Sequence, residues 1–188
     1  TNTDYLSHIL NDAAFLSASI TTRYLDSFVY YPNTFSVLSP GTMTTVQDYP
    51  GRQGYWDIGI PPSGPYDNWS FRLGNRLLGN TEDCAGLEIT LSGPELVFHC
   101  SSQIIITGAT IEAKLNGEQI DCWQIYSVSS GDKLTLGQIK AAGTRAYLLV
   151  AGGIQCPNYL GSRSTFTLGQ FGGHVGRTLK TGDVLHLS

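Results

Sequence analysis

The chain has 188 residues, of which 41% are hydrophobic and 14% are charged, and it carries a formal net charge of −4. This length suits one good-sized domain or two small ones. The excess of acidic over basic residues gives no electrostatic reason to expect binding to nucleic acid or to an anionic membrane surface. No apolar run approaches the roughly 20 residues that span a bilayer, which argues against a membrane protein.

The cysteines are widely scattered and form no CxxC pair; they are Cys84, Cys100, Cys122 and Cys156. Structural zinc sites commonly draw ligands from closely spaced cysteine pairs, so we expect no metal site. Unpaired cysteines that behave as small buried hydrophobic residues are typical of reducing compartments. The sequence therefore predicts free, mostly buried thiols and a cytoplasmic location.

In chain order, residues 1–34 differ from the rest. Apolar residues spaced three and four apart predict a helix from about residue 2 to residue 15. A second short helix is expected over 22–28, followed by an aromatic linker, 29–34, that contains Pro32. This segment is too short to build a core of its own, so it must pack on another part of a protein.

From Phe35 to Ser188 the pattern is mainly β, with short apolar runs separated by turn residues. Asn116-Gly117 is the strongest hairpin signal, because both residues tolerate positive φ. Many short strands with regular turns favour a closed or nearly closed β-barrel or a sandwich. The expected strands are 35–39, 43–47, 86–91, 95–99, 102–107, 111–115, 119–128, 133–138, 145–151 and 183–187.

One helix interrupts the strands, over about 68–78. Asp67 is its expected N-cap and Gly79 its C-terminal stop. Trp69, Leu73 and Leu77 recur at helical spacing, so we expect them to form its inner face.

The densest cluster of turn residues and polar groups is TTVQDYPGRQGYWDIGIPPSGPYD, Thr44–Asp67. Arg52 carries a planar fork that suits a carboxylate or carbamoyl oxygen, and Gln47 or Asp48 could position an amide N–H. The structural alternative is that Asp48 accepts hydrogen bonds from Arg52 or from its own turn. Ser63 lacks the G-x-S-x-G setting of a nucleophile, so capping and turn formation explain it better.

Two other polar features have open interpretations. Glu88 lies in the middle of an apolar strand and is either exposed or buried and paired, the exposed reading being slightly favoured by alternation. LGSRSTF, 160–166, is a second polar loop that suits the mouth of a barrel and contains Arg163 and Ser164. His174 has the right ordinary pKa for a general base, but a lone loop histidine is more often a surface residue.

Several runs together resemble the allophanate-hydrolase-subunit-2-like domain of urea carboxylase, urea amidolyase and the C component of 5-oxoprolinase. They include TTVQDYPGRQGYWDIGIPPSGPYD, RLGNRLLGN, LEITLSGPELVF, YLLVAGGI and LGSRSTF. The opening run TNTDYLSHILNDAAFLSASITTRYLDSF resembles the last helical element of biotin carboxylase domains. This order of segments resembles urea carboxylase more than the 5-oxoprolinase component.

The resemblance implies a mainly β, cyclophilin-like β-barrel with one internal helix, preceded by a short N-terminal helical segment. On this view residues 1–34 are a biotin carboxylase tail plus linker, and 35–188 are the first part of a carboxyltransferase domain. The implied reaction is ATP- and biotin-dependent: CO2 passes from carboxybiotin to urea and gives allophanate. By loop match, the candidate residues are Asp48, Arg52 and Arg163 as catalytic groups and Gln47, Ser63, Tyr66 and Ser164 as substrate-binding groups.

The resemblance also implies partners and cofactors outside this chain. They are urea, a biotin carrier domain, a subunit-1-like carboxyltransferase half, and a biotin carboxylase domain that uses ATP and Mg²⁺. The chain itself has no P-loop and no Met-Lys biotin attachment site. We expect a fragment that is inactive alone. The alternatives are a component of a 5-oxoprolinase-type ATP-dependent lactam hydrolase and a non-catalytic regulatory module.

Overall fold

The computed structural model describes residues 2–28, 30, 32–140 and 142–188. Contacts divide the chain into two units, Thr1–Pro32 and Asn33–Ser188. Residues 29 and 31 of the expected linker lie outside the described residues, and Thr34 already begins the first strand.

The first unit contains three short helices, α1 (Asn2–Asn11), α2 (Ala13–Leu16) and α3 (Tyr24–Ser27). The expected continuous helix to residue 15 is wrong, because Asp12 leaves helical geometry with ψ at 139° and caps α2. Its carboxylate accepts the N–H of Ala14 at 2.9 Å. Tyr5 packs edge-on against Phe28 and Tyr30, with ring centroids 5.7 and 5.4 Å away, and this aromatic contact ties the two ends of the unit together.

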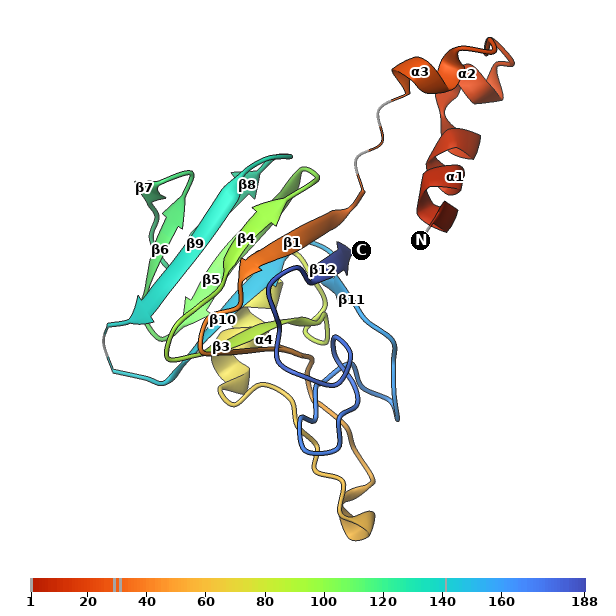
Figure 1. Ribbon diagram of the computed structural model, residues 1–188. Helices are drawn as coiled ribbons and strands as arrows, with labels where there is room; N and C mark the ends of the chain where they lie inside the picture. The colour runs from red at the N-terminus through yellow and green to blue at the C-terminus, as the bar shows by residue number, and fades with distance from the viewer. Residues whose placement is uncertain (1, 29, 31, 141) are drawn as a thin grey trace. The chain divides into compact units, whose positions relative to one another are not determined.

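The second unit consists mainly of two antiparallel sheets (Figure 1). One has the strand order β11 (Ile154–Gln155), β12 (Val184–Leu187), β1 (Thr34–Ser39), β4 (Glu95–Phe98), β9 (Lys133–Ile139), β6 (Ile111–Leu115) and β7 (Glu118–Gln119). The other has the order β2 (Met43–Gln47), β3 (Gly86–Thr90), β10 (Arg145–Val150), β5 (Ser102–Gly108) and β8 (Ile125–Val128).

The main core lies between the sheets, where Phe35, Leu96 and Leu134 of the larger sheet join Leu87 and Leu148 of the smaller in one buried cluster. The mainly β prediction is confirmed. Among the described residues the strand pairings form two open sheets and do not close into one ring. The cyclophilin-like barrel therefore stays a prediction.

Helix α4 (Asn68–Leu77) covers the outer face of the smaller sheet, and its ends are as predicted. The Asp67 carboxylate accepts the N–H of Ser70 at 3.1 Å, and Gly79 follows the helix with φ at +78°. The predicted inner face is wrong: Trp69, Leu73 and Leu77 are 76%, 49% and 46% exposed.

The face of α4 that packs on the sheet is formed instead by Phe71, Gly74 and Asn75. A Cβ on Gly74 would lie 2.8 Å from the Thr107 methyl group, so the missing side chain allows the helix to approach β5 closely. The sequence periodicity correctly predicts a helix here, but the helix has apolar residues on two faces, and the predicted inner face is the exposed one.

Most expected strands are present, and the turn at Asn116-Gly117 is confirmed by positive φ at both residues and by the pairing of β6 with β7. The expected strand 119–128 is wrong, because the chain turns between β7 and β8, where Trp123 has φ at +66°. The four cysteines are free, but only Cys100 is buried. Within the described part of the chain, no helix is long and apolar enough to cross a membrane.

Candidate functional site

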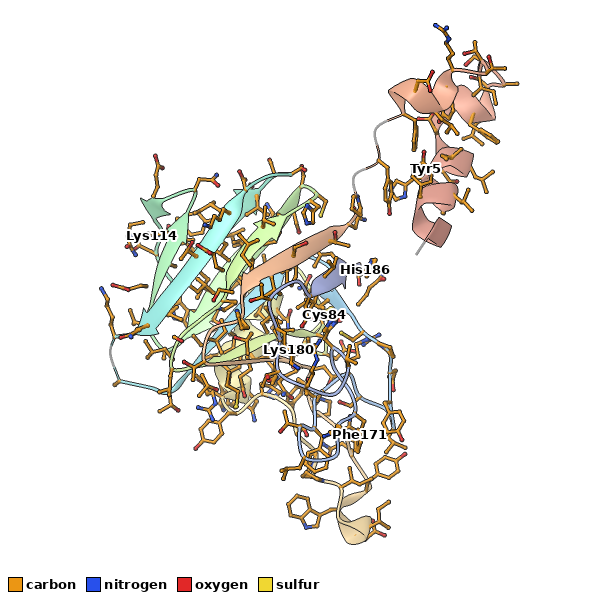
Figure 2. All side chains as sticks on the ribbon, viewed as in Figure 1. Tyr5, Cys84, Lys114, Phe171, Lys180 and His186 are labelled. Carbon is orange, nitrogen blue, oxygen red and sulfur yellow. The ribbon has the colours of Figure 1, made fainter. Side chains whose placement is uncertain are left out.

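Two loop regions come together at one end of the smaller sheet (Figure 1). The first follows β2 and includes the short 3-10 helix η1 (Trp56–Ile58); the second follows β11. Phe171 of the second loop is labelled in Figure 2, and its ring packs against those of Tyr159 and Phe166, with centroids 4.9 and 5.4 Å away. Hydrogen bonds join the two loops through Asp48 and Arg52, which are more than 100 residues from their partners in the sequence.

Asp48 is the centre of this junction. Its carboxylate is buried and accepts three hydrogen bonds, from the Ser162 hydroxyl at 2.5 Å, the Ser164 hydroxyl at 2.6 Å and the N–H of Arg163 at 2.7 Å. The N–H of Asp48 in turn donates to the Ser164 hydroxyl oxygen at 3.0 Å. Hydrogen bonds to a charged group are the strong ones, so this cluster holds the backbone of the second loop rigidly.

Arg52 braces the same junction from inside. The side chain is 1% exposed, and it donates from Nε to the Tyr159 carbonyl at 3.1 Å and from Nη2 to the Ser164 carbonyl at 2.9 Å. The guanidinium also lies over the Phe171 ring, 4.8 Å from its centroid. Burial lowers the pKa of Arg52, and the nearby Asp48 charge opposes that shift.

The direct pairing of Arg52 with Asp48 that the sequence left open is not among the described hydrogen bonds and ion pairs. Gly172 leaves room for the guanidinium: a Cβ there would lie 2.8 Å from Nη2, and the residue has φ at +73°. The arrangement makes Arg52 an internal support of the loop junction.

Arg163 differs from Arg52, because its backbone is fixed by Asp48 while its guanidinium makes no hydrogen bond or ion pair with the described residues and acts electrostatically on Cys156. It lines a cavity of about 610 Å³ together with Cys84, Cys156 and His186. Cys84 and His186 lie near each other in Figure 2. A second cavity of about 610 Å³ adjoins the first and shares Cys156 and His186 with it. Burial raises the pKa of the Cys156 thiol to about 11, which keeps it neutral and unreactive at neutral pH.

His174 lines the second cavity and is positioned by Asp183. Its Nε2 lies 3.4 Å from Asp183 Oδ1, and Arg177 binds both oxygens of Asp183 at 2.7 and 2.8 Å. The Arg177 hydrogen bonds hold the pKa of Asp183 at about 2. His174 is thus a fixed, largely covered side chain rather than a free surface residue.

The remaining sequence candidates divide into two groups. Gln47 lies beside the Asp48 cluster and accepts the N–H of Gly64 at 3.0 Å, while its amide donates to Thr45 Oγ1 at 3.0 Å. Ser63 is in the same turn region with φ at +57°. Tyr66 is 78% exposed and lines a separate cavity of about 370 Å³ beside Arg145.

Glu88 is buried, which corrects the favoured exposed reading. Its Oε2 accepts the N–H of Tyr66 at 2.7 Å and the hydroxyl of Tyr147 at 3.1 Å, and Arg145 Nε lies 3.6 Å from Oε1. Burial raises the pKa of Glu88, and these contacts oppose the shift. The alternation rule gave the wrong face because four successive residues of β3, 86–89, are all buried, so both faces of this strand are covered.

Sequence reasoning also left out Ser162 as a site candidate, although it binds Asp48 as closely as Ser164 does. The signal was available, because Ser162 stands in the same polar run as Arg163 and Ser164. Cys156 and His186 carried no local signal, since only the folding of β11 and β12 side by side brings them together.

Comparisons with known proteins agree with one another. Residues 58–188 match the family model described as "Carboxyltransferase domain, subdomain A and B". The chain is 50% identical over 188 residues to a urea amidolyase of Lachancea kluyveri and covers 10% of that protein. It is 38% identical over 149 residues to the C component of 5-oxoprolinase from Escherichia coli strain K12, covering 79% of this chain and 47% of that protein.

A solved structure is similar to this chain in both fold and sequence. The crystal structure of the K. lactis urea amidolyase matches 99% of this chain with a TM-score of 0.90 and 52% identity, and 11% of that chain is covered. The present chain thus spans about a tenth of the length of its urea amidolyase relatives. Because the family model covers more than half of the residues, the chain belongs to the carboxyltransferase domain family, subdomains A and B.

Proposed function

We propose that this chain is part of the carboxyltransferase component of a biotin-dependent urea carboxylase, an ATP-dependent ligase, and that it helps to transfer CO2 from carboxybiotin to urea, giving allophanate. The observation that carries the proposal is that Arg163 lines a cavity of about 610 Å³ while its guanidinium makes no hydrogen bond or ion pair within the described part of the chain. The urea amidolyase names of relatives near 50% identity support the choice of acceptor.

Within this cavity, which Asp83 also lines, Arg163 is the residue that suits a carboxylated ligand. A planar guanidinium binds a carboxylate through two parallel hydrogen bonds, and the Arg163 backbone is anchored by Asp48. Carboxybiotin would supply the carboxyl group, carried on a domain outside this chain. In this proposal Arg163 orients that group, Ser164 and Asp48 fix the loop that carries Arg163, and Arg52 supports the loop from below.

Gln47, Ser63 and Tyr66 stay proposed substrate-binding groups. Gln47 and Ser63 lie in the loop region beside Asp48. Tyr66 instead lines the separate cavity next to Arg145 and would have to act there. A role for Tyr66 in holding urea therefore needs a partner surface that closes over both cavities.

The proposed setting is a larger cytoplasmic enzyme. Residues 1–34 would be the helical tail of a biotin carboxylase domain plus a linker, and 35–188 the first part of a cyclophilin-like carboxyltransferase domain. The partners would be the biotin carrier domain, the subunit-1-like half and the biotin carboxylase domain, which would use ATP and Mg²⁺. The helical unit, separate in its contacts from the β unit, is consistent with this division.

A second candidate function is an ATP-dependent lactam hydrolase component, favoured by the 38% identity to the C component of 5-oxoprolinase. Assaying the full-length protein decides between the two. We expect ATP turnover that requires urea and bicarbonate and that avidin abolishes. Turnover of 5-oxoproline that avidin leaves unchanged would overturn the urea carboxylase proposal.

A further inference from the structure

Helix α4 has large apolar side chains on two faces, and only one face is covered by the second unit. Phe71 packs inward on the smaller sheet, while Trp69, Leu73 and Leu77 point away from it with exposed fractions of 76%, 49% and 46%. A surface helix of a single domain normally presents polar residues outward, and a helix that is apolar all round is normally buried. The outer face of α4 thus has the composition of an interface.

Trp123 extends this face from the neighbouring chain segment. It stands in the turn before β8, is 40% exposed, and has φ at +66°, a conformation that costs free energy for a bulky residue. Its N–H donates to the Ile106 carbonyl of β5 at 2.7 Å, which holds the strained turn in place.

The two tryptophans, Leu73 and Arg76 line a groove of about 350 Å³; we call the set Trp69, Leu73, Arg76, Leu77 and Trp123 the α4 surface. Arg72 and Arg76 both pair with the single carboxylate of Glu82, so the groove holds an excess of one positive charge. The Arg76 side chain is 69% exposed and can bind a further carboxylate. Tryptophan and arginine are the residue types most enriched at the centres of protein interfaces.

We propose that the α4 surface is a docking site for another segment of the longer polypeptide, one that presents a bulky apolar side chain next to a carboxylate. The identity of this partner rests on the proposed function, in which the chain works inside a multidomain enzyme. A second copy of this chain fits less well, because pairing two α4 surfaces would bring together two grooves that each carry an excess positive charge.

The test compares the 188-residue chain with the full-length protein by hydroxyl-radical oxidation of Trp69 and Trp123, followed by peptide mass spectrometry. We expect oxidation of both tryptophans to be about fivefold or more slower in the full-length protein, because interface cores exclude water. Arg76→Glu in the full-length protein should raise their oxidation towards that of the isolated chain. Lys114→Glu, a charge reversal on β6, serves as the matched control and should leave oxidation unchanged.

Equal oxidation in the two proteins would overturn the proposal. If the tryptophans stay protected in the Arg76→Glu protein, the partner does not bind Arg76 through a carboxylate. If the isolated chain sediments as a dimer and Leu73→Glu makes it a monomer, the occupant of the α4 surface is a second copy of this chain. Urea-dependent carboxylation is measured on the same full-length preparation. Activity without protection refutes the docking site alone, whereas protection without activity refutes the proposed reaction alone.

Discussion

Replacing Arg52 by lysine should lower the stability of the second unit. The guanidinium makes two hydrogen bonds to the carbonyls of Tyr159 and Ser164, and a lysine ammonium can replace one of them at most. Nη1 has no hydrogen-bond partner among the described residues, so its loss costs no bond. A hydrogen bond to a charged group contributes about 1.5–3 kcal/mol, and stacking on Phe171 adds about 0.5–2 kcal/mol.

Allowing for one regained hydrogen bond, Arg52→Lys should cost about 2–5 kcal/mol of unfolding free energy. For a chain of this size, 1 kcal/mol shifts the melting temperature by about 2–4 °C, so the expected decrease is about 4–20 °C. Circular dichroism melting of the 188-residue chain measures it, with the exposed Arg23→Lys as the matched control. A melting temperature within about 1 °C of the unchanged chain, less than the shift expected for 1 kcal/mol, would refute the view of Arg52 as an internal support.

Three further predictions concern other parts of the second unit. Burial raises the pKa of Glu88, so folding favours its protonated form, and the free energy of unfolding should fall as pH rises from about 4.3 through the raised folded pKa. Urea titrations at several pH values measure this slope, and Glu88→Gln should remove it. Gly74→Ala should cost about 1–3 kcal/mol by pushing α4 away from Thr107, and an unchanged urea midpoint would contradict this packing. Asp183→Asn should destabilise the chain at pH 7, because Arg177 holds the pKa of Asp183 at about 2. The difference in unfolding free energy from the unchanged chain should shrink as pH falls from about 3.9 through 2, and a pH-independent difference would count against the ion pair.

The β elements could be predicted well because their signals are local. A two-residue hairpin turn requires positive φ, which Asn116 and Gly117 adopt readily, and the helix α4 likewise has a cap and a stop in its own sequence. The strand expected over 119–128 failed because an apolar run with good alternation conceals a turn that is held by a long-range bond to Ile106. Closure of the sheets depends on pairings between distant strands, which local patterns do not specify.

The faces of elements were harder to predict than the elements themselves. Trp69, Leu73 and Leu77 were assigned inward because they are large and apolar, but close packing on β5 requires the small Gly74. Glu88 was assigned outward because its neighbours are apolar, although both faces of its strand are buried. For Glu88, burial of both strand faces overrides the rule that one apolar face identifies the core, and for α4 the close approach at Gly74 overrides it.

The candidate site could be predicted as a set of residues but not as a set of roles. Two polar loops were identified, and they do meet at Asp48. Arg52 and Arg163 look equivalent in the sequence, since each is an arginine in a polar turn. Their contacts separate them: the buried guanidinium of Arg52 donates to backbone carbonyls, while Arg163 lines the cavity.

In the proposed reaction Arg163 holds the group that is transferred, so a change in its side chain should affect transfer and leave the fold intact. Arg163→Lys in the full-length protein keeps the charge and loses the planar fork, so we expect allophanate formation to fall about tenfold or more, corresponding to about 1.4 kcal/mol or more. Bicarbonate- and biotin-dependent ATP cleavage should persist, and the melting temperature should stay near that of the unchanged protein, because the anchoring contact of Arg163 to Asp48 is made by its backbone. Allophanate formation at the unchanged rate in a folded Arg163→Lys protein would contradict this role of Arg163.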